Sequence, residues 1–466
     1  MRKVLLTALA LAIAGCASTP PPKSGTASSK PYSFVDDPYP STYRVIASPP
    51  VLISGATVLV GDGGRLENAD VLMRDGKLVA IGAGVDAPAD AVRVDARGKW
   101  VTPGIIDVHS HLGVYASPGV NAHSDGNEAT APVTAQVWAE HSVWPQDPGF
   151  DAARAGGVTA LQILPGSANL VGGRGVTLKN VPATTYQGMK FPGAPWGLKM
   201  ACGENPKRVY GQRGGPSTRM GNIAGFRAAF ADAAEYMNKR KGGSGADSGK
   251  DSGGKRDLKL DSLAGTINGD ILVHNHCYRA DEMAIMLDLA KEFGFKVAAF
   301  HHGVEAYKIA DRLAAEGTCG ALWADWWGFK MESFDGIQEN LLMVDRAPGG
   351  CAIVHSDSGE GIQRLNQEAA KVMANARRIG IEITPEHAMR WLTLNAAKSM
   401  GIDKVTGSLT AGKNADVVVW NGNPFSSYAL AEQVYVDGAR VYDRHDRGRQ
   451  PVSDFMLGQD GQGGVR

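Results

Sequence analysis

The chain has 466 residues, and its 48 basic and 48 acidic side chains give a formal net charge of zero. This length suffices for one large domain or two medium ones, and the hydrophobic content of 43% is ordinary for a globular protein. No basic stripe stands out along the sequence, which argues against a nucleic acid as the partner.

The first residues predict a lipoprotein signal peptide over residues 1–15. Arg2 and Lys3 precede an apolar stretch, Val4 to Ala14, that is too short to span a bilayer. The stretch runs into Ile-Ala-Gly-Cys at positions 13–16, which resembles the lipobox of bacterial lipoproteins. This resemblance implies cleavage before Cys16, lipidation of its sulfur, and a periplasmic protein tethered to a membrane. An ordinary secretory signal that is cut nearby is the alternative.

Four further cysteines remain after Cys16, at positions 202, 277, 319 and 351. An even number permits two disulfides in an oxidising compartment, but such spacing in a large domain does not demand them. We therefore expect buried free thiols.

The pattern along the chain predicts an α/β fold. Residues 16–45 are rich in Pro, Ser and Thr and predict an extended linker. Two β-rich segments, 46–103 and 404–446, flank a middle part, 104–403, in which short apolar runs alternate with helical patterns. We expect a (β/α)8 TIM-type barrel in the middle and a small β-sandwich domain formed from both flanks.

Three finer features complete this outline. The stretch "RADEMAIMLDLAKEFG" predicts an amphipathic helix from Asp281, with Met283, Ile285, Met286, Leu289 and Ala290 on its apolar face. The Gly/Ser-rich, charged stretch 238–257 predicts a mobile surface insertion, and residues 447–466 form a tail.

Polar side chains recur at the ends of four predicted strands. The runs "GIIDVHSH", "GDILVHNH", "FKVAAFHH" and "CAIVHSD" end in these residues: His109 and His111, His274 and His276, His301 and His302, and His355 and Asp357. The carboxyl ends of barrel strands converge on one face, so these groups should meet in one pocket. Imidazole nitrogens and carboxylate oxygens are ligands for zinc and similar ions. The recurrence predicts a metal site.

The motifs that carry this site resemble the amidohydrolase superfamily. "VTPGIIDVHSHLG" resembles its first barrel strand, "VHSD" its last metal-binding strand, and "WLTLNAAKSMGIDKVTGSLTAGKNADVVVWNGNP" its closing region. The resemblance covers roughly residues 50–445, and within the superfamily it is strongest to the imidazolonepropionase-like and prolidase-like branches.

The resemblance implies one or two divalent ions, zinc foremost, bound by His109, His111, His274 and His302, with Asp357 as ligand and proton shuttle. His276 shares a strand face with His274, so either imidazole could be the ligand. We favour His274 as ligand and expect His276 to help to polarise the scissile carbonyl. If the strand stays regular, His301 should face away from His302 and lie in the core or behind the metal ligands.

Many relatives bridge two metals with a carboxylated lysine or a glutamate, and "GLKMACGENPKR" offers Lys199 and Glu204. Glu204 follows the apolar run at the expected strand end, whereas Lys199 lies inside the run. We therefore favour Glu204, with Lys199 as the alternative bridging ligand. If neither side chain binds, the site is mononuclear.

These features imply an enzyme that hydrolyses an amide-type C–N bond in a small molecule, with Asp357 as general base and acid. The amide is linear, as in a dipeptide or an acyl amino acid, or cyclic. Side chains that could clamp a substrate are Asn169, Arg174, Arg208 and Arg219. For Trp323, Trp326 and Trp327, aromatic core packing is the default expectation, with pocket lining as the alternative.

Two other functions remain open at this point. A ring deaminase would keep the fold and change the bond, and a non-catalytic, membrane-tethered binding protein would have lost the chemistry. A homo-oligomer is compatible with each of these readings.

Overall fold

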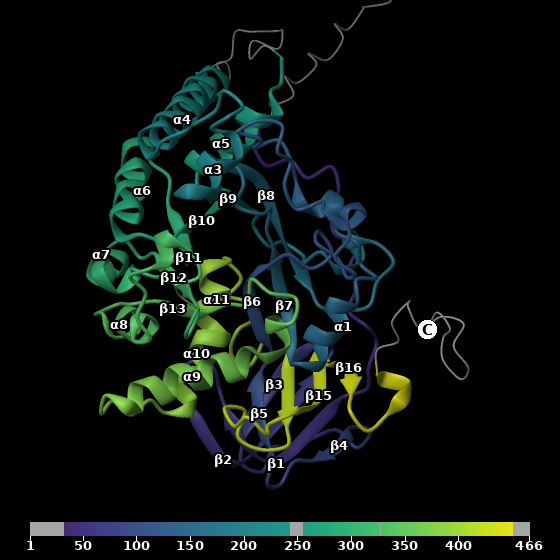
Figure 1. Ribbon diagram of the computed structural model, residues 1–466. Coiled ribbons are helices and arrows are strands. Elements are labelled where there is room, and N and C mark those ends of the chain that lie inside the picture. The colour runs from purple at the N-terminus through teal and green to yellow at the C-terminus, as the bar shows by residue number, and fades with distance from the viewer. Residues whose placement is uncertain (1–31, 243–254, 327, 451–466) are drawn as a thin grey trace, which may run out of the picture.

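The computed structural model describes residues 32–242, 255–326 and 328–450, and these residues form two sheets of eight strands each (Figure 1). One sheet is a nearly closed barrel, and the second, built from the two flanks of the chain, lies below the barrel in Figure 1. The predicted signal peptide, Cys16 and residues 451–466 lie outside the described residues.

The barrel sheet follows the chain order from first to last strand. Its strands are β6 (Ile105–Ser110), β7 (Val158–Ile163), β8 (Val171–Lys179), β9 (Gly197–Ala201), β10 (Leu272–Cys277), β11 (Val297–His302), β12 (Cys319–Leu322) and β13 (Ala352–Val354). The predicted α/β fold with an eight-stranded barrel is confirmed at this level.

One strand departs from the predicted parallel pattern. Strand β8 pairs antiparallel with both β7 and β9. Only residues 164–170 connect β7 to β8, and a parallel crossover needs about a dozen residues or more. The third strand therefore starts at the face where the other strands end.

The last strand is joined to the first by hydrogen bonds just beyond β13. The backbone N–H of Asp357 donates to the carbonyl of His109 at 3.1 Å, and that of Ser356 donates to the Asp107 carboxylate at 3.2 Å. The hydroxyl of Ser356 also donates to Asp107. These contacts hold Asp357 beside the histidines of β6.

Helices cover the outside of the barrel, most densely beside β10 to β13 (Figure 1). They are α1 (Pro148–Ala155), α2 (Tyr186–Met189), α3 (Glu204–Tyr210), α4 (Arg219–Gly242), α5 (Leu258–Ile267), α6 (Ala280–Phe293), α7 (Ala310–Ala315), α8 (Asn340–Arg346), α9 (Leu365–Arg378), α10 (Pro385–Leu392) and α11 (Leu394–Ser399). No helix in the described ranges combines the length and the apolarity that a membrane crossing requires.

Helix α6 confirms the helix expected from Asp281. Met283, Met286, Leu289 and Ala290 are buried as predicted, but Ile285 is exposed. The helix ends at Gly294, whose positive φ of 79° is the left-handed conformation that glycine adopts readily.

The second sheet takes strands from both flanks. Its strands are β1 (Val51–Leu59), β2 (Arg65–Arg74), β3 (Lys77–Gly82), β4 (Val92–Asp95), β5 (Trp100–Pro103), β14 (Val417–Trp420), β15 (Ala431–Val436) and β16 (Ala439–Asp443). Strand β14 pairs with β5, so the C-terminal flank continues the sheet of the N-terminal flank. The joint contribution of both flanks agrees with the prediction, but the pairing forms one sheet and does not establish the two facing sheets of a sandwich.

The second half of the predicted linker is bound to the folded body. Phe34 is buried, its carbonyl accepts a hydrogen bond from Arg174, and the Thr42 N–H donates to the carbonyl of Gln187. The hydroxyl of Tyr43 donates to Asp437. Aromatic side chains give this Pro/Ser-rich segment an apolar surface to bury, which its overall composition conceals.

The predicted insertion also differs from the structure at both ends. Residues 238–242 continue helix α4, and Asp257 caps α5 by accepting from the N–H groups of Lys259 and Leu260. Residues 243–254 lie outside the described residues.

The four cysteines form two disulfides, Cys202–Cys277 and Cys319–Cys351, so the expectation of free thiols is wrong. Cys202 directly follows β9 and Cys277 ends β10, so the first disulfide joins the carboxyl ends of two neighbouring strands. Cys351 directly precedes β13 and Cys319 begins β12, so the second joins the amino ends of another pair. Parallel pairing of each strand pair brings these positions together, a proximity that sequence spacing does not reveal.

Candidate metal centre

Two histidines of the first barrel strand meet an aspartate that follows the last strand. His109 Nε2 lies 3.2 Å from His111 Nε2. Asp357 Oδ1 lies 3.4 Å from His109 Nε2 and 3.1 Å from His111 Nε2. Three potential ligand atoms from opposite ends of the barrel segment thus converge on one point.

Lys199 joins this group from strand β9. The residue is 1% exposed, and its Nζ lies 3.2 Å from His109 Nε2. Within the described part of the chain, no carboxylate forms an ion pair with it at 4.0 Å or less. A lysine buried among imidazoles, with the Asp357 carboxylate near but not paired with it, suits a ligand role better than a structural one.

A second group of imidazoles lies beside the first. His302 Nε2 is 3.7 Å from Asp357 Oδ2, and the ring centroid of His302 lies 4.7 Å from that of His276 and 5.0 Å from that of His355. The buried Nδ1 atoms of His276 and His302 have no hydrogen-bond partner among the described residues. Unpartnered buried nitrogens are costly unless a ligand satisfies them, so this donor set fits a metal ion.

The backbone at two of these positions is unusual. His302 has a φ of 73° and Asp357 a φ of 51°, both in the left-handed region that non-glycine residues seldom adopt. The turn at His302 ends the regular alternation of β11, so His301 and His302 both face the barrel interior. The predicted opposition of these two side chains is therefore wrong.

His301 lies behind the candidate ligands and connects two of the predicted ones. Its Nδ1 is 2.9 Å from His109 Nδ1, and its Nε2 is 2.9 Å from His274 Nδ1. The prediction that His301 lies in the core or behind the ligands agrees with this position. His274 is buried deeper, beside His301, whereas His276 lies nearer the mouth of the barrel.

Burial keeps the imidazoles neutral, which is the form that binds a metal. Loss of hydration lowers the pKa of His109, His276, His301 and His302 well below its ordinary value. It also lowers the pKa of Lys199 to about 8. Burial would raise the pKa of Asp357, but its hydrogen bond with His111 and the charge of Lys199 outweigh this, and the pKa lies below its usual value.

Glu204 lies outside the cluster. It is the first residue of α3, its carboxylate is 3.7 Å from Lys330 Nζ, and its backbone N–H donates to Glu332 at 2.9 Å. The placement therefore does not support the preference for Glu204 over Lys199.

Two of the four predicted substrate clamps have internal roles. Asn169 is buried, and its amide donates to the carbonyls of Glu128 and Ala131 and to the hydroxyl of Thr134. The buried Arg174 guanidinium donates to Ser262 and to a backbone carbonyl and lies over the rings of two tryptophans. Both side chains are engaged in bonds within the protein, Asn169 to a loop and Arg174 to helix α5 and the N-terminal segment.

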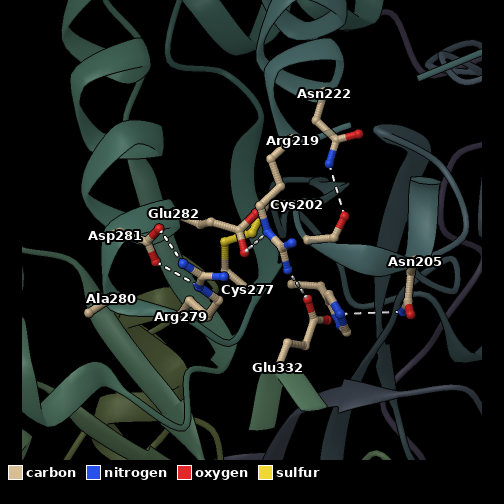
Figure 2. The surroundings of a disulfide bond; sticks show 12 residues. Cys202, Asn205, Arg219, Asn222, Cys277, Arg279, Ala280, Asp281, Glu282 and Glu332 are labelled. Atoms are coloured by element: carbon tan, nitrogen blue, oxygen red, sulfur yellow. Dashed lines mark hydrogen bonds and ion pairs between the residues drawn. A yellow bond between two sulfur atoms is a disulfide. The ribbon is translucent and has the colours of Figure 1, made fainter. Parts of the chain in front are cut away.

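The other two clamps also lie apart from the histidines. Arg208 is exposed on α3. Arg219 forms ion pairs at 3.0 Å with both Glu282 and Glu332, next to the Cys202–Cys277 disulfide (Figure 2). Because its guanidinium is already paired with two carboxylates, Arg219 stabilises the structure around this disulfide.

A cavity of about 480 Å³ opens above Asp357. Tyr278, Trp323, Asp325, Trp326 and Phe329 complete its lining. Trp323 is buried in a small apolar cluster with Tyr278 and Val304, as the default of core packing expects, and it also lines the pocket. Trp326 is partly exposed and lines the pocket, and Trp327 lies outside the described residues. Sequence reasoning missed Tyr278 and Phe329, although Tyr278 stands two residues after His276.

Sequence reasoning also missed Asp107. This buried carboxylate accepts hydrogen bonds from Ser356 and from the His109 backbone, and burial raises its pKa to about 7. Its signal was present, because an acidic residue in the apolar run "GIIDVHSH" must have partners when buried.

The fold and the residues at its strand ends define a class, the barrel hydrolases that hold metals at the carboxyl face. The amidohydrolase family model matches residues 345–442. An amidohydrolase from Thermotoga maritima MSB8 is 36% identical in sequence, with a TM-score of 0.77 over 84% of this chain and all of that one.

Two curated relatives extend the comparison. The amidohydrolase tasK of Hapsidospora irregularis is 33% identical over 400 residues, which is 80% of this chain but only 40% of that longer protein. The imidazolonepropionase of Shewanella oneidensis is 26% identical over 398 residues, 77% of this chain and 88% of that enzyme.

The chain belongs to the amidohydrolase family. Its relatives and structural neighbours indicate a hydrolase that acts on carbon–nitrogen bonds. They do not favour the alternative of a non-catalytic binding protein.

Proposed function

We propose that this protein is a metal-dependent amidohydrolase that cleaves the amide C–N bond of a small molecule. The observation that carries the proposal is the position of Asp357. Its carboxylate lies within 3.1 to 3.7 Å of His111, His109 and His302, at the bottom of the cavity of about 480 Å³. A base among metal ligands under an open cavity is the arrangement that water-mediated hydrolysis requires.

We assign the ligands from this placement. His109, His111, Asp357, His276 and His302 would together hold one or two divalent ions, and Lys199 would add a further ligand once its Nζ is carboxylated. Each ring has one unpartnered buried nitrogen, Nδ1 of His276 and Nε2 of His274. His276 replaces His274 because its ring centroid lies 4.7 Å from that of His302, whereas the ring of His274 lies beside His301, at 5.1 Å. Nitrogen and carboxylate ligands favour zinc among the divalent ions, so zinc is the metal we propose.

Each side chain then has a defined task. Divalent ions in such sites supply Lewis acidity, which activates water and polarises a carbonyl near neutral pH. Asp357, kept ionised by His111 and Lys199, accepts the proton of the attacking water on a carboxylate oxygen and returns it to the leaving nitrogen. The aromatic side chains around the cavity limit the access of bulk water to this transfer.

The test is metal analysis combined with a panel of dipeptides, acyl amino acids and cyclic amides. We expect released amine with the metal-loaded protein, and a decrease in kcat of about a hundredfold or more for Asp357→Asn. Metal content measured on the same samples separates lost chemistry from lost metal. Asp281→Asn, which changes an exposed carboxylate of α6, is the matched control.

Two outcomes would change the assignment. Ammonia released from ring amines, with no cleavage of amides, would replace the proposal by deamination. A metal-loaded wild type that is inactive on the whole panel would refute hydrolysis of these amides.

We also propose that the protein is exported and anchored through Cys16. The lipobox-like sequence supports this location, and so do the two disulfides, because such bonds persist in oxidising compartments outside the cytoplasm.

A further inference from the structure

The cavity above Asp357 has a lining of unusual composition. Four of its six residues are aromatic, namely Tyr278, Trp323, Trp326 and Phe329, and the other two are Asp325 and Asp357. The chemistry proposed above uses the carboxylate of Asp357 and requires the rings only to limit the access of bulk water, a task that does not need aromatic side chains. The four rings therefore need a separate explanation.

The inner rings are fixed directly to the candidate metal centre. The ring of Trp323 stacks on that of His302, with 4.4 Å between centroids and 26° between planes. The indole N–H of Trp323 donates to the carbonyl of Ser356 at 3.2 Å. Tyr278 stacks on His302 from another side, at 5.6 Å and 21°. A group bound against these rings would be held at a constant distance from Asp357.

The outer rings leave apolar surface uncovered. Trp326 is 40% exposed and Phe329 57% exposed, although both are large apolar side chains. Trp326 stacks on Trp323 at 5.2 Å, and Phe329 meets Trp323 edge-on at 6.0 Å. Exposed rings that extend a buried aromatic wall into a cavity are typical of a binding site for an apolar group.

The charges at the rim are paired within the protein. Asp325 Oδ1 lies 3.0 Å from Lys371 Nζ, and Lys330 Nζ lies 3.1 Å from Glu332. Lys330 Nζ also lies 4.0 Å from the centroid of the Tyr278 ring, so the position of a bound cation on that face is already taken. This arrangement favours a neutral group over a charged one.

We propose that this cavity binds the aromatic side chain of the substrate residue that carries the scissile amide. The substrate class is then acyl or peptidyl derivatives of aromatic amino acids. This inference rests on the proposed function, and it adds Trp326 and Phe329 as specificity-determining residues.

The test compares N-acetyl derivatives of phenylalanine, tryptophan, leucine, alanine and lysine on the zinc-loaded protein. Burial of an aromatic side chain in place of a methyl group should raise kcat/KM by about tenfold to a hundredfold. Trp326→Ala and Phe329→Ala should each reduce the preference for phenylalanine over alanine by about tenfold, through KM. Trp326→Phe should restore most of it. Met331→Ala, at a side chain that is 79% exposed on the same segment and outside the lining, should leave the ratio unchanged.

A binding measurement separates this inference from the proposed function. Asp357→Asn, titrated with indole-3-acetate by calorimetry, should bind it at least tenfold more tightly than acetate, and the additional Trp326→Ala change should abolish the difference. Equal binding of both ligands, or a kcat/KM that does not favour aromatic substrates, would overturn the aromatic site while hydrolysis stands. Selective binding of indole-3-acetate with no turnover of any amide would instead refute the proposed function and leave the site in place.

Discussion

Three buried imidazoles form a chain behind the metal-binding face. A neutral imidazole carries one N–H, so each contact in the chain needs one donor and one acceptor. If His109 keeps Nε2 free for a metal, its Nδ1–H donates to His301 Nδ1, and His301 Nε2–H donates to His274 Nδ1, each across 2.9 Å. The chain fixes all three tautomers and orients the ring of His109.

His301→Phe should therefore weaken zinc binding by about tenfold to a hundredfold, because it removes the acceptor that orients His109. Competition with a chromogenic chelator measures the affinity, and circular dichroism checks that the variant is folded. His445→Phe, at an exposed histidine just beyond β16, should bind zinc as the wild type does. A folded His301→Phe protein with unchanged affinity would contradict the orienting role.

Side-chain length explains why the placement of two predicted ligands does not support them. His274 and Lys199 are register partners in neighbouring strands, at the same level of the barrel. The long lysine side chain extends from that level to His109, whereas the short imidazole of His274 remains below. The sequence shows at which level of the barrel a side chain starts. The length of that side chain then decides whether its terminal atom comes close to His109.

Lys199→Ala should lower the zinc content of the purified protein, whereas Glu204→Gln should leave it unchanged. The reason is placement, since Lys199 Nζ is 3.2 Å from His109 and Glu204 lies beside Lys330. Elemental analysis after exhaustive dialysis measures both variants. The opposite result, with zinc lost only from Glu204→Gln, would restore the glutamate as the bridging ligand.

At the scale of elements, the two disulfides differ in their position on the barrel. Cys202–Cys277 joins the carboxyl ends of β9 and β10, next to Lys199 and His276, and is surrounded by the ion pairs of Arg219 (Figure 2). Cys319–Cys351 joins the amino ends of β12 and β13, away from the candidate metal centre. The two disulfides can therefore be compared directly. We expect the first to stabilise both the fold and the candidate metal centre, and the second to stabilise the fold alone.

Replacement of both cysteines of either disulfide by serine should lower the free energy of unfolding by roughly 4 kcal/mol, from the loop lengths that the disulfides close. Only Cys202→Ser with Cys277→Ser should also weaken zinc binding, because it frees the strand ends that carry Lys199 and His276. Thermal unfolding and chelator competition measure the two effects. Equal loss of zinc affinity from both double variants would show that the effect is global destabilisation.

At the same scale, the sequence pattern of a strand does not reveal the direction in which the strand runs. The apolar runs predicted individual barrel strands because burial on both faces leaves a clear sequence signal, and their alternation with helical patterns predicted the eight-stranded barrel. They did not predict that β8 runs antiparallel, since a strand's composition is the same in either direction. The short connection over residues 164–170 is the sign of this reversal, because a parallel crossover needs about a dozen residues or more.

At the scale of the whole molecule, the composition of the N-terminal segment gave a wrong prediction, because a few of its residues attach it to the folded body. The segment before the first sheet was expected to be an extended linker, yet Phe34, Thr42 and Tyr43 attach it to the body. The partners in these contacts are Arg174, Gln187 and Asp437, which lie far from the segment in the sequence. A sequence pattern alone does not show that they contact it. The attachment means that residues 32–43 belong to the folded body, well before strand β1.

Because residues 32–43 are bound to the body, we expect loss of the proposed lipid anchor to change the location of the protein but not its activity. Cys16→Ser should move the protein from the membrane fraction to the soluble periplasmic fraction, because the proposed lipid is attached to that sulfur. Its kcat/KM should equal that of the wild type, since the contacts of residues 32–43 hold the segment on the body without the anchor. Detergent phase partitioning and the mass of the N-terminal peptide measure the outcome, with Ser24→Ala as the control for a nearby change. If Cys16→Ser partitions with the membrane as the wild type does, the lipid anchor is wrong and the ordinary secretory signal replaces it.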